Sequence, residues 1–224
     1  MILNTPAIVL HRMKYKNSSL IARLFTKDTG KISIIINGAR KQKGNVFGII
    51  EPPNIIKLNY YQKKTGSLQI YKEGSFLCNN FLIREDILKL GVALFTVEII
   101  DKTFHEYDVN PEVYDLVCKT LQTINDSTYD SRLILCFFLL KLIEELGFMI
   151  DLDNKENIAV PINNEIKLFL LSLNEYSINN LGNINYSNIN LIEIITLLES
   201  YIKQHLKLNK DIQSLKMIKD LTYG

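Results

Sequence analysis

The sequence lacks closely spaced cysteines. Its 224 residues include three, Cys78, Cys118 and Cys136, which stand far apart and form no CxxC pair. Zinc modules and small disulfide frameworks both need cysteines at short spacings or in even numbers. The pattern therefore argues against both kinds of scaffold, and it predicts reduced thiols in a cytosolic protein without a metal or other cofactor.

Long apolar runs are also absent. The longest uninterrupted run is LILCFFLL, residues 133–140, and a helix needs about 20 apolar residues to cross a bilayer. The first residues, MILNTPAIVLHRMKY, carry only a short apolar run with no basic leader before it, unlike a signal peptide. We expect a cytoplasmic protein with no membrane segment, in which residues 133–140 belong to a buried core helix.

Acidic side chains are scarce in the first third of the chain. Residues 1–75 contain 13 lysines and arginines against three acids, a net charge of +10, whereas the remaining residues carry −8. A chain polarised in this way is typical of a basic module that meets a polyanion, joined to a module that does not. The alternative is a basic face that is merely solvated, in a chain rich in lysine.

The same basic third has the pattern of short strands. Apolar residues alternate with polar ones in five segments rich in β-branched and aromatic residues. In SSLIARLFT, for example, Leu20, Ala22 and Leu24 fall on one face and Arg23 on the other. Turn-forming residues separate the segments, as in YKNSS, TKDTGK and QKKTGS. Five such strands predict a small antiparallel barrel of the OB-fold type, a common platform for single-stranded nucleic acid.

From about Phe76 the apolar residues take the spacing of helices. Asn110 and Pro111 have the residue types of a helix start, and Gly147 marks the end of the apolar helix. Helical spacing also fits residues 84–107, 163–174, 190–208 and 211–221, and the Asn-rich stretch 176–190 is expected to be a connector. The sequence therefore predicts a multi-domain α+β fold, with an OB-fold β-barrel at residues 1–76 and an all-α helical bundle domain at 77–224.

The order of these segments resembles the RecO family of bacterial DNA-repair mediators. The resemblance begins in TPAIVLHRMKYKNSSLIARLFTKDTGKISIIINGARKQKG, residues 5–44, where GKIS and GAR with following basic residues stand at the family's spacing. It continues in EPPNIIKLNYY, REDILKLGVALFTVEII, LLKLIEELGF and YIKQHLKLNKDIQSLKMIKDL. Together these segments cover most of the chain in the order found in the family.

The resemblance implies a nucleoid-associated protein that acts in recombinational repair by the RecF pathway. It implies binding of single- and double-stranded DNA, annealing of complementary strands, and cooperation with RecR, and in many bacteria RecF, to load RecA onto DNA coated by single-strand-binding protein (SSB). Many members carry a four-cysteine zinc module after the core helix. Here that place is taken by IDLDNKENIAVPIN, which has no cysteine, so we expect no zinc.

The basic side chains of the barrel are the expected DNA contacts. The loop GARKQKGNVFG, residues 38–48, combines glycines with cations and can approach a phosphate backbone closely, releasing condensed counterions. The predicted DNA-binding residues are Arg12, Lys14 and Lys16 at the end of the first strand, Arg23 in the second, Arg40, Lys41 and Lys43 in the loop, and Lys63 and Lys64 in the last hairpin turn. Tyr60, Tyr61 and Tyr71 offer stacking faces for bases, with packing inside the barrel as the alternative.

The helical part is expected to bind protein. The family resemblance implies that it holds the acidic, aromatic-ended C-terminal tail of SSB in an apolar pocket with nearby cations. The candidate cations are Arg132, Lys141, Lys203 and Lys207. The alternative is that these charges are simply solvated, as is usual at helix ends and on exposed faces.

Catalytic motifs are not found. TGKIS lacks the glycine-rich start of a P-loop and has Ile32 where that motif needs Ser or Thr. HEYDV, with His105, has no second histidine of a zinc helix, and DLDN lacks the later glycine and glutamate of a calcium loop. We therefore expect neither an enzyme nor a small-molecule substrate. Two alternatives to a DNA mediator remain: an OB-fold RNA-binding or ribosome-associated protein, and a scaffold whose basic face meets an acidic protein.

Overall fold

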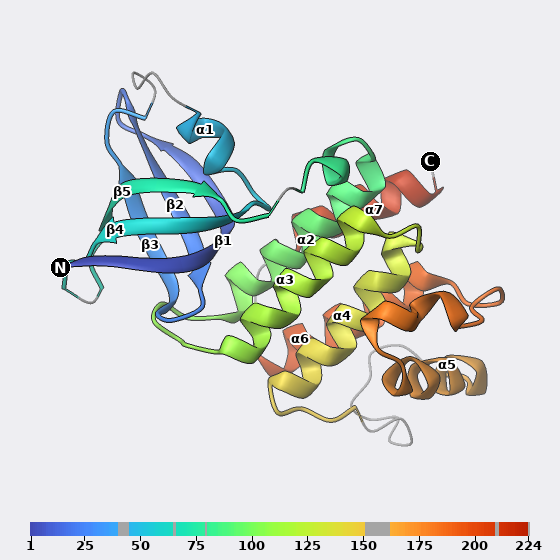
Figure 1. Ribbon diagram of the computed structural model, residues 1–224. Coiled ribbons are helices and arrows are strands. Elements are labelled where there is room, and N and C mark those ends of the chain that lie inside the picture. The colour runs from blue at the N-terminus through green and yellow to red at the C-terminus, as the bar shows by residue number, and fades with distance from the viewer. Residues whose placement is uncertain (40–44, 65, 79, 151–161, 209–210, 224) are drawn as a thin grey trace.

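A β-barrel lies on one side of the molecule and a group of helices on the other (Figure 1). The computed structural model describes residues 1–39, 45–64, 66–78, 80–150, 162–208 and 211–223. The chain builds the barrel first, from its N-terminus, and then passes into the helices. This arrangement confirms the predicted α+β fold.

The barrel has the strand order of the OB-fold. Its strands are β1 (Ile2–Tyr15), β2 (Ser19–Thr26), β3 (Gly30–Ile36), β4 (Ile55–Tyr61) and β5 (Gln69–Phe76), with the short helix α1 (Val46–Ile49) between β3 and β4. They close in the order β1-β2-β3-β5-β4. Neighbouring strands are antiparallel, except that β3 and β5 pair in parallel at Ile34 and Ile35. Closure removes unpaired sheet edges and leaves turns and outer faces for binding.

The alternation read from the sequence fills the barrel. Leu20, Ala22 and Leu24 of β2 are each at most 1% exposed and belong to the barrel core, as predicted. β1 is buried on both faces. Its Ala7 and Val9 point into the barrel core, whereas the alternate side chains of the strand join the core of the helices.

The helical part consists of six α-helices and two 3₁₀ segments among the described residues. They are η1 (Phe81–Arg84), α2 (Ile87–Thr103), α3 (Pro111–Asp126), α4 (Ser131–Glu145), α5 (Asn164–Glu175), η3 (Ile178–Asn183), α6 (Leu191–His205) and α7 (Gln213–Tyr223). The segment 176–190, predicted to be a connector only, therefore contains a 3₁₀ segment. Residues 104–107 are not helical, although their spacing continued that of α2.

Local signals set the helix ends. The Asn110 side chain accepts a hydrogen bond from the Val113 N–H, with Pro111 at the first helical position, as the sequence predicted. Gly147 follows α4 with a φ of +78° and donates its N–H to the Glu144 carbonyl. Eleven of the fifteen residues of α4 are buried, which confirms its prediction as the core helix.

Barrel and helices share an apolar core. Ile8, Leu10 and Phe25 of the barrel belong to the same buried cluster as the residues of α2, α3 and α4. The Phe25 ring lies 5.0 Å from that of Phe104, which follows α2. The predicted division after residue 76 thus falls at the end of β5, while the packing continues across it. Within the described residues, no helix is long and apolar enough to cross a membrane.

Candidate nucleic-acid interface

One predicted DNA contact, Arg23, faces the helices. Its side chain projects from the outer face of β2 and makes a two-pronged ion pair with Asp101 of α2, with Nε–Oδ1 at 2.8 Å and Nη2–Oδ2 at 2.5 Å. Lys31 of β3 approaches the same aspartate, since its Nζ lies 2.5 Å from the Asp101 carbonyl oxygen and 3.6 Å from the carboxylate. Burial lowers the pKa of Lys31, against the raising effect of Asp101. These two cations therefore tie the barrel to α2.

The loop after α2 extends this contact along β3. The Tyr107 N–H donates to the Lys31 carbonyl at 2.8 Å, and the Ser33 hydroxyl donates to the Glu106 carboxylate at 2.7 Å. Nearby, Lys27 pairs with Asp115 of α3 at 2.8 Å. The β2–β3 face, which many OB-folds offer to nucleic acid, is thus partly covered by the protein's own acidic residues.

Arg12 is also held by protein groups. Its guanidinium lies 2.9 Å from the Glu51 carboxylate, donates to the Phe47 carbonyl at 2.6 Å and stands 5.3 Å from the centre of the Phe47 ring. These contacts attach α1 to β1. Arg12 and Arg23 remain predictions as DNA contacts, but phosphates would have to compete with the carboxylates that now hold them.

Four other predicted contacts form no ion pair within the described part of the chain. Lys14 and Lys16 lie at the β1–β2 turn, and Lys63 and Lys64 at the β4–β5 turn, all exposed. The Lys16 Nζ lies 5.3 Å from the centre of the Tyr15 ring. Figure 1 shows both turns on the side of the barrel away from the helices. The structure therefore leaves two basic turns open to a polyanion.

The remaining predicted cations lie outside the described residues, and the three tyrosines differ in how far they are buried. Arg40, Lys41 and Lys43 lie outside the described residues, between Ala39 and Asn45. Tyr60 is 1% exposed and packs in the barrel core, so its prediction as a stacking face is wrong. Tyr71 is half-buried against that core, while Tyr61 is 42% exposed. Period-2 alternation could not separate these cases, because both faces of a closed barrel can carry aromatic residues.

The four cations predicted to hold an acidic tail are not brought together. Arg132 pairs with Asp130 at the start of α4, at 2.6 Å. Lys203 pairs with Asp211 at 2.8 Å, and Lys207 is exposed just beyond α6. Of the four, Lys141 alone lines the large groove between α3, α4 and η3.

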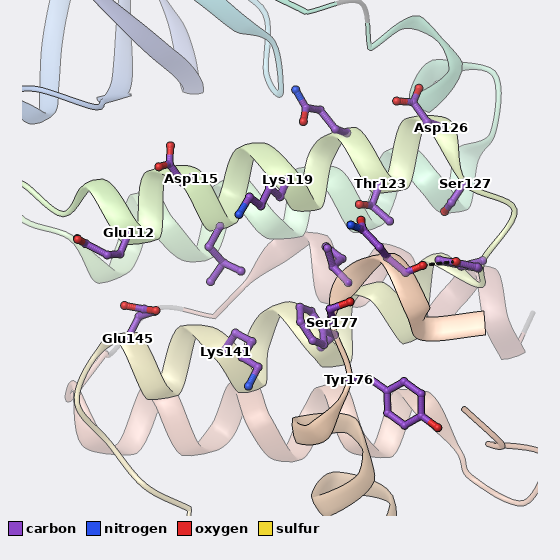
Figure 2. A pocket seen from close by; sticks show the side chains of 16 residues that line it. Glu112, Asp115, Lys119, Thr123, Asp126, Ser127, Lys141, Glu145, Tyr176 and Ser177 are labelled. Atoms are coloured by element: carbon purple, nitrogen blue, oxygen red, sulfur yellow. Dashed lines mark hydrogen bonds between the residues drawn. The ribbon is translucent and has the colours of Figure 1, made fainter. Parts of the chain in front are cut away.

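That groove has a volume of about 950 Å³ and is seen in Figure 2. The charged side chains on its walls are the acids Glu112, Asp115, Asp126 and Glu145 and the cations Lys119 and Lys141. Because acids outnumber cations, the electrostatics of the lining oppose an acidic tail, apart from the immediate neighbourhood of the two lysines. The placement of the SSB tail thus remains a prediction.

No cluster of three or more His, Cys, Asp or Glu side chains with metal-binding geometry occurs within the ranges that the structure describes. The three cysteines are free thiols, and burial raises the pKa of Cys118 to about 12, which keeps it protonated and weakly nucleophilic. His105 is exposed just beyond the end of α2.

Sequence reasoning missed the acids that meet the barrel. Asp101, Glu106 and Asp115 contact Arg23, Ser33 and Lys27 respectively. No local motif marks them, but the opposite net charges of the two parts of the chain were a usable signal. Opposite charges on adjoining modules favour contact between the modules as well as contact with a polyanion.

Two family models and several curated relatives match the sequence of this chain. Residues 1–79 match the family model Recombination protein O N terminal, and residues 84–166 match Recombination protein O C terminal. The chain is 29% identical over 148 residues to the DNA repair protein RecO of Chlorobium phaeobacteroides, covering 66% of this chain and 57% of that protein. It is 31% identical over 124 residues to that of Salinibacter ruber, covering 55% and 48%.

A third relative, the DNA repair protein RecO of Listeria monocytogenes, is 29% identical over 148 residues, or 65% of this chain and 56% of that protein. The chain thus spans about half the length of the curated relatives it matches. The residues that match the first family model form the barrel, and those that match the second extend from the end of η1 to the start of α5. The chain belongs to the recombination protein O (RecO) family.

Proposed function

We propose that this protein is a non-enzymatic, DNA-binding recombination mediator in DNA repair. It binds single- and double-stranded DNA through phosphates and anneals complementary strands. Together with RecR, and with RecF where it is used, it helps to load RecA onto SSB-coated single strands. Membership of the RecO family supports the role in repair, and the curated relatives are named DNA repair proteins.

One observation carries the DNA-binding part of the proposal. Lys14, Lys16, Lys63 and Lys64 are exposed on two turns of an OB-fold barrel, on the side away from the helices. Lysines that form no ion pair within the described residues keep their charge for phosphates, and their binding releases condensed counterions. Contacts of this kind read no base sequence, which suits a mediator that acts on any single strand.

The decisive measurement is the anisotropy of a labelled single-stranded DNA oligonucleotide at increasing salt. Wild type is expected to bind with a steep dependence on salt. The combined variant Lys14→Ala/Lys16→Ala/Lys63→Ala/Lys64→Ala should reduce the slope of log K against log salt by about 0.7 for each phosphate contact removed. The variant Arg40→Ala/Lys41→Ala/Lys43→Ala tests the loop between β3 and α1 in the same way.

Lys27→Ala is the matched control, because Asp115 already neutralises this lysine; it should leave the slope unchanged. Absence of binding at low salt would refute the proposal and favour a protein-interaction scaffold. A strong preference for an RNA competitor of the same sequence would favour the RNA-binding alternative. Annealing of complementary strands, bare and SSB-coated, with and without RecR, then tests the mediator activity itself.

A further inference from the structure

A cavity of about 300 Å³ opens at the end of the barrel beside the basic β4–β5 turn. It lies between the β2–β3 turn, the β4–β5 hairpin and the loop that follows α2. Lys63, one of the exposed turn lysines, stands on its wall. Its volume is at the lower end of the range of small-molecule sites, roughly 300–1,000 Å³, which is adequate for one planar heterocycle.

The cavity wall carries polar groups that lack some of their hydrogen-bond partners within the described residues. The Tyr107 hydroxyl accepts hydrogen bonds from Gln69 Nε2 at 3.0 Å and from the Gly66 N–H at 3.2 Å. Its own proton has no acceptor among the described residues. The Gln62 side-chain amide likewise has no hydrogen-bond partner within the described ranges, so a donor pair and an acceptor remain available there.

The fold holds Tyr107 firmly in place. Its φ of +66° is in the left-handed region, which is uncommon for a residue other than glycine and persists when the surroundings demand it. Its N–H is bonded to the Lys31 carbonyl, and its ring packs against the barrel core. The cavity is therefore a preformed feature of the contact between the barrel and the loop after α2.

The chemistry of the lining points away from a phosphate inside the cavity. Asp28 also lines it, and its carboxylate would repel a phosphate while accepting a hydrogen bond from an amino group. The Val109 side chain, 49% exposed, adds an apolar surface at the same cavity. An amide, a phenol and a carboxylate beside apolar surface match the polar edge and flat faces of a nucleobase.

We propose that this cavity receives one unstacked nucleobase of a bound single strand, while Lys63 contacts an adjacent phosphate. Gln62 and Tyr107 hydrogen-bond the edge of the base. A base in a duplex is stacked and paired, so it cannot enter without being extruded. The cavity would therefore give the barrel a preference for single strands that phosphate contacts alone do not provide. This inference rests on the proposed binding of single-stranded DNA.

The test compares two oligonucleotides of equal length and charge, an ordinary single strand and one built of abasic residues. Wild type should bind the ordinary strand more tightly, by about fivefold or more, as expected of one good hydrogen-bonded base contact. Gln62→Ala and Tyr107→Phe should each lose most of this preference, through weaker binding of the ordinary strand alone. Lys63→Ala should weaken the binding of both strands equally, because both carry phosphates.

Gln204→Ala, which removes an exposed glutamine on α6, is the matched control and should retain the preference. Tyr107→Phe also loses two hydrogen bonds within the fold, so Gln62→Ala, at an exposed position, is the deciding variant. If neither oligonucleotide binds wild type, the proposed function itself fails. If wild type binds both equally, or Gln62→Ala keeps the preference, DNA binding stands and the nucleobase site is refuted.

Discussion

Both sides of the barrel carry several cations, but these cations have different surroundings in the structure. On the side facing the helices, Arg23, Lys27 and Lys31 meet Asp101 and Asp115. On the opposite side, the lysines of the β1–β2 and β4–β5 turns form no ion pair within the described residues. The net charge of a segment therefore does not say whether its cations bind a ligand or another part of the same protein.

The difference follows from what surrounds each cation. Arg23, Lys31 and Asp101 lie next to a shared apolar core, where water is partly excluded and an ion pair is screened less, whereas the Lys27–Asp115 pair is largely exposed. The lysines on the turns are exposed to solvent, and a surface ion pair there would contribute little. Selection for solubility or ligand binding is thus enough to keep the turn lysines, whereas the partly buried Arg23 and Lys31 need the Asp101 carboxylate.

The largest effect is expected when that partner is removed. Asp101→Ala leaves Arg23 and Lys31 without their common carboxylate, and the Asp101 side chain is only 11% exposed. We expect a loss of about 3 kcal/mol in the free energy of unfolding, at the lower end of the values for a broken buried pair, because the Arg23 side chain is 32% exposed. Urea unfolding measures it.

Asp220→Ala is the control, since this exposed aspartate of α7 has no ion pair among the described residues. It should change the free energy of unfolding by less than about 0.5 kcal/mol. Equal effects of the two substitutions would show that the helix-facing ion pairs add nothing to stability.

Two glycines with a left-handed backbone conformation allow a second comparison between a barrel position that the loop after α2 contacts and one that it does not. Gly30 has a φ of +72°, and a Cβ there would lie 2.2 Å from the Asp108 carbonyl oxygen in the loop after α2. Gly38 has a φ of +67°, and a Cβ there would meet nothing within 4 Å among the residues that the structure describes. We expect Gly38→Ala to cost about 1 kcal/mol of stability, for the backbone conformation alone.

Gly30→Ala should cost about 2 kcal/mol, because the loop after α2 must also move off the barrel. Thermal and urea unfolding of the two variants give the difference between their losses of stability. This difference measures the contact with the loop after α2, because the cost of the backbone conformation is common to both variants. If the two glycine substitutions cost the same, the loop does not need its close approach to β3.

Much of the fold was readable because its signals are local. Alternation at Leu20, Ala22 and Leu24 and the start of α3 at Asn110 and Pro111 depend on residues close in sequence. The core helix α4 could be predicted because its run of apolar residues is longer than a half-buried helix would show. In each case a few neighbouring residues determine the result, so the sequence is sufficient.

The candidate site was less readable because it depends on contacts between distant residues. The pairing of Arg23 with Asp101 joins residues 78 positions apart, and nothing in SSLIARLFT reveals it. Tyr60 and Tyr61 are neighbours, yet one is in the core and the other exposed, and the pattern alone did not indicate which face was internal. The cavity beside Lys63 needed Tyr107, which arrives from the loop after α2.

The smallest expected effect concerns His11, on the helix-facing side of β1. It lines a cavity between the barrel, α2 and α7, and its Nδ1 is buried without a hydrogen-bond partner within the described ranges. Burial, and then the nearby charge of Arg23, lower the pKa of His11, while Asp101 and Glu98 act in the opposite direction. The folded protein therefore binds this proton less tightly than the unfolded chain.

It follows that the contribution of His11 to stability is complete above its ordinary pKa of about 6.5 and declines as the pH falls from there toward the lowered value. The urea concentration at the unfolding midpoint should decrease as the pH is lowered from about 7.5 to about 5.5, a range in which most carboxylates stay ionised. His11→Asn should flatten that fall, whatever it does to stability at neutral pH, and His105→Asn should not, since His105 is exposed. A decline that persists in His11→Asn would assign the proton to another group. A decline lost only in that variant would show that the helix-facing side, which already holds the Arg23–Asp101 ion pair, disfavours the protonated form of His11.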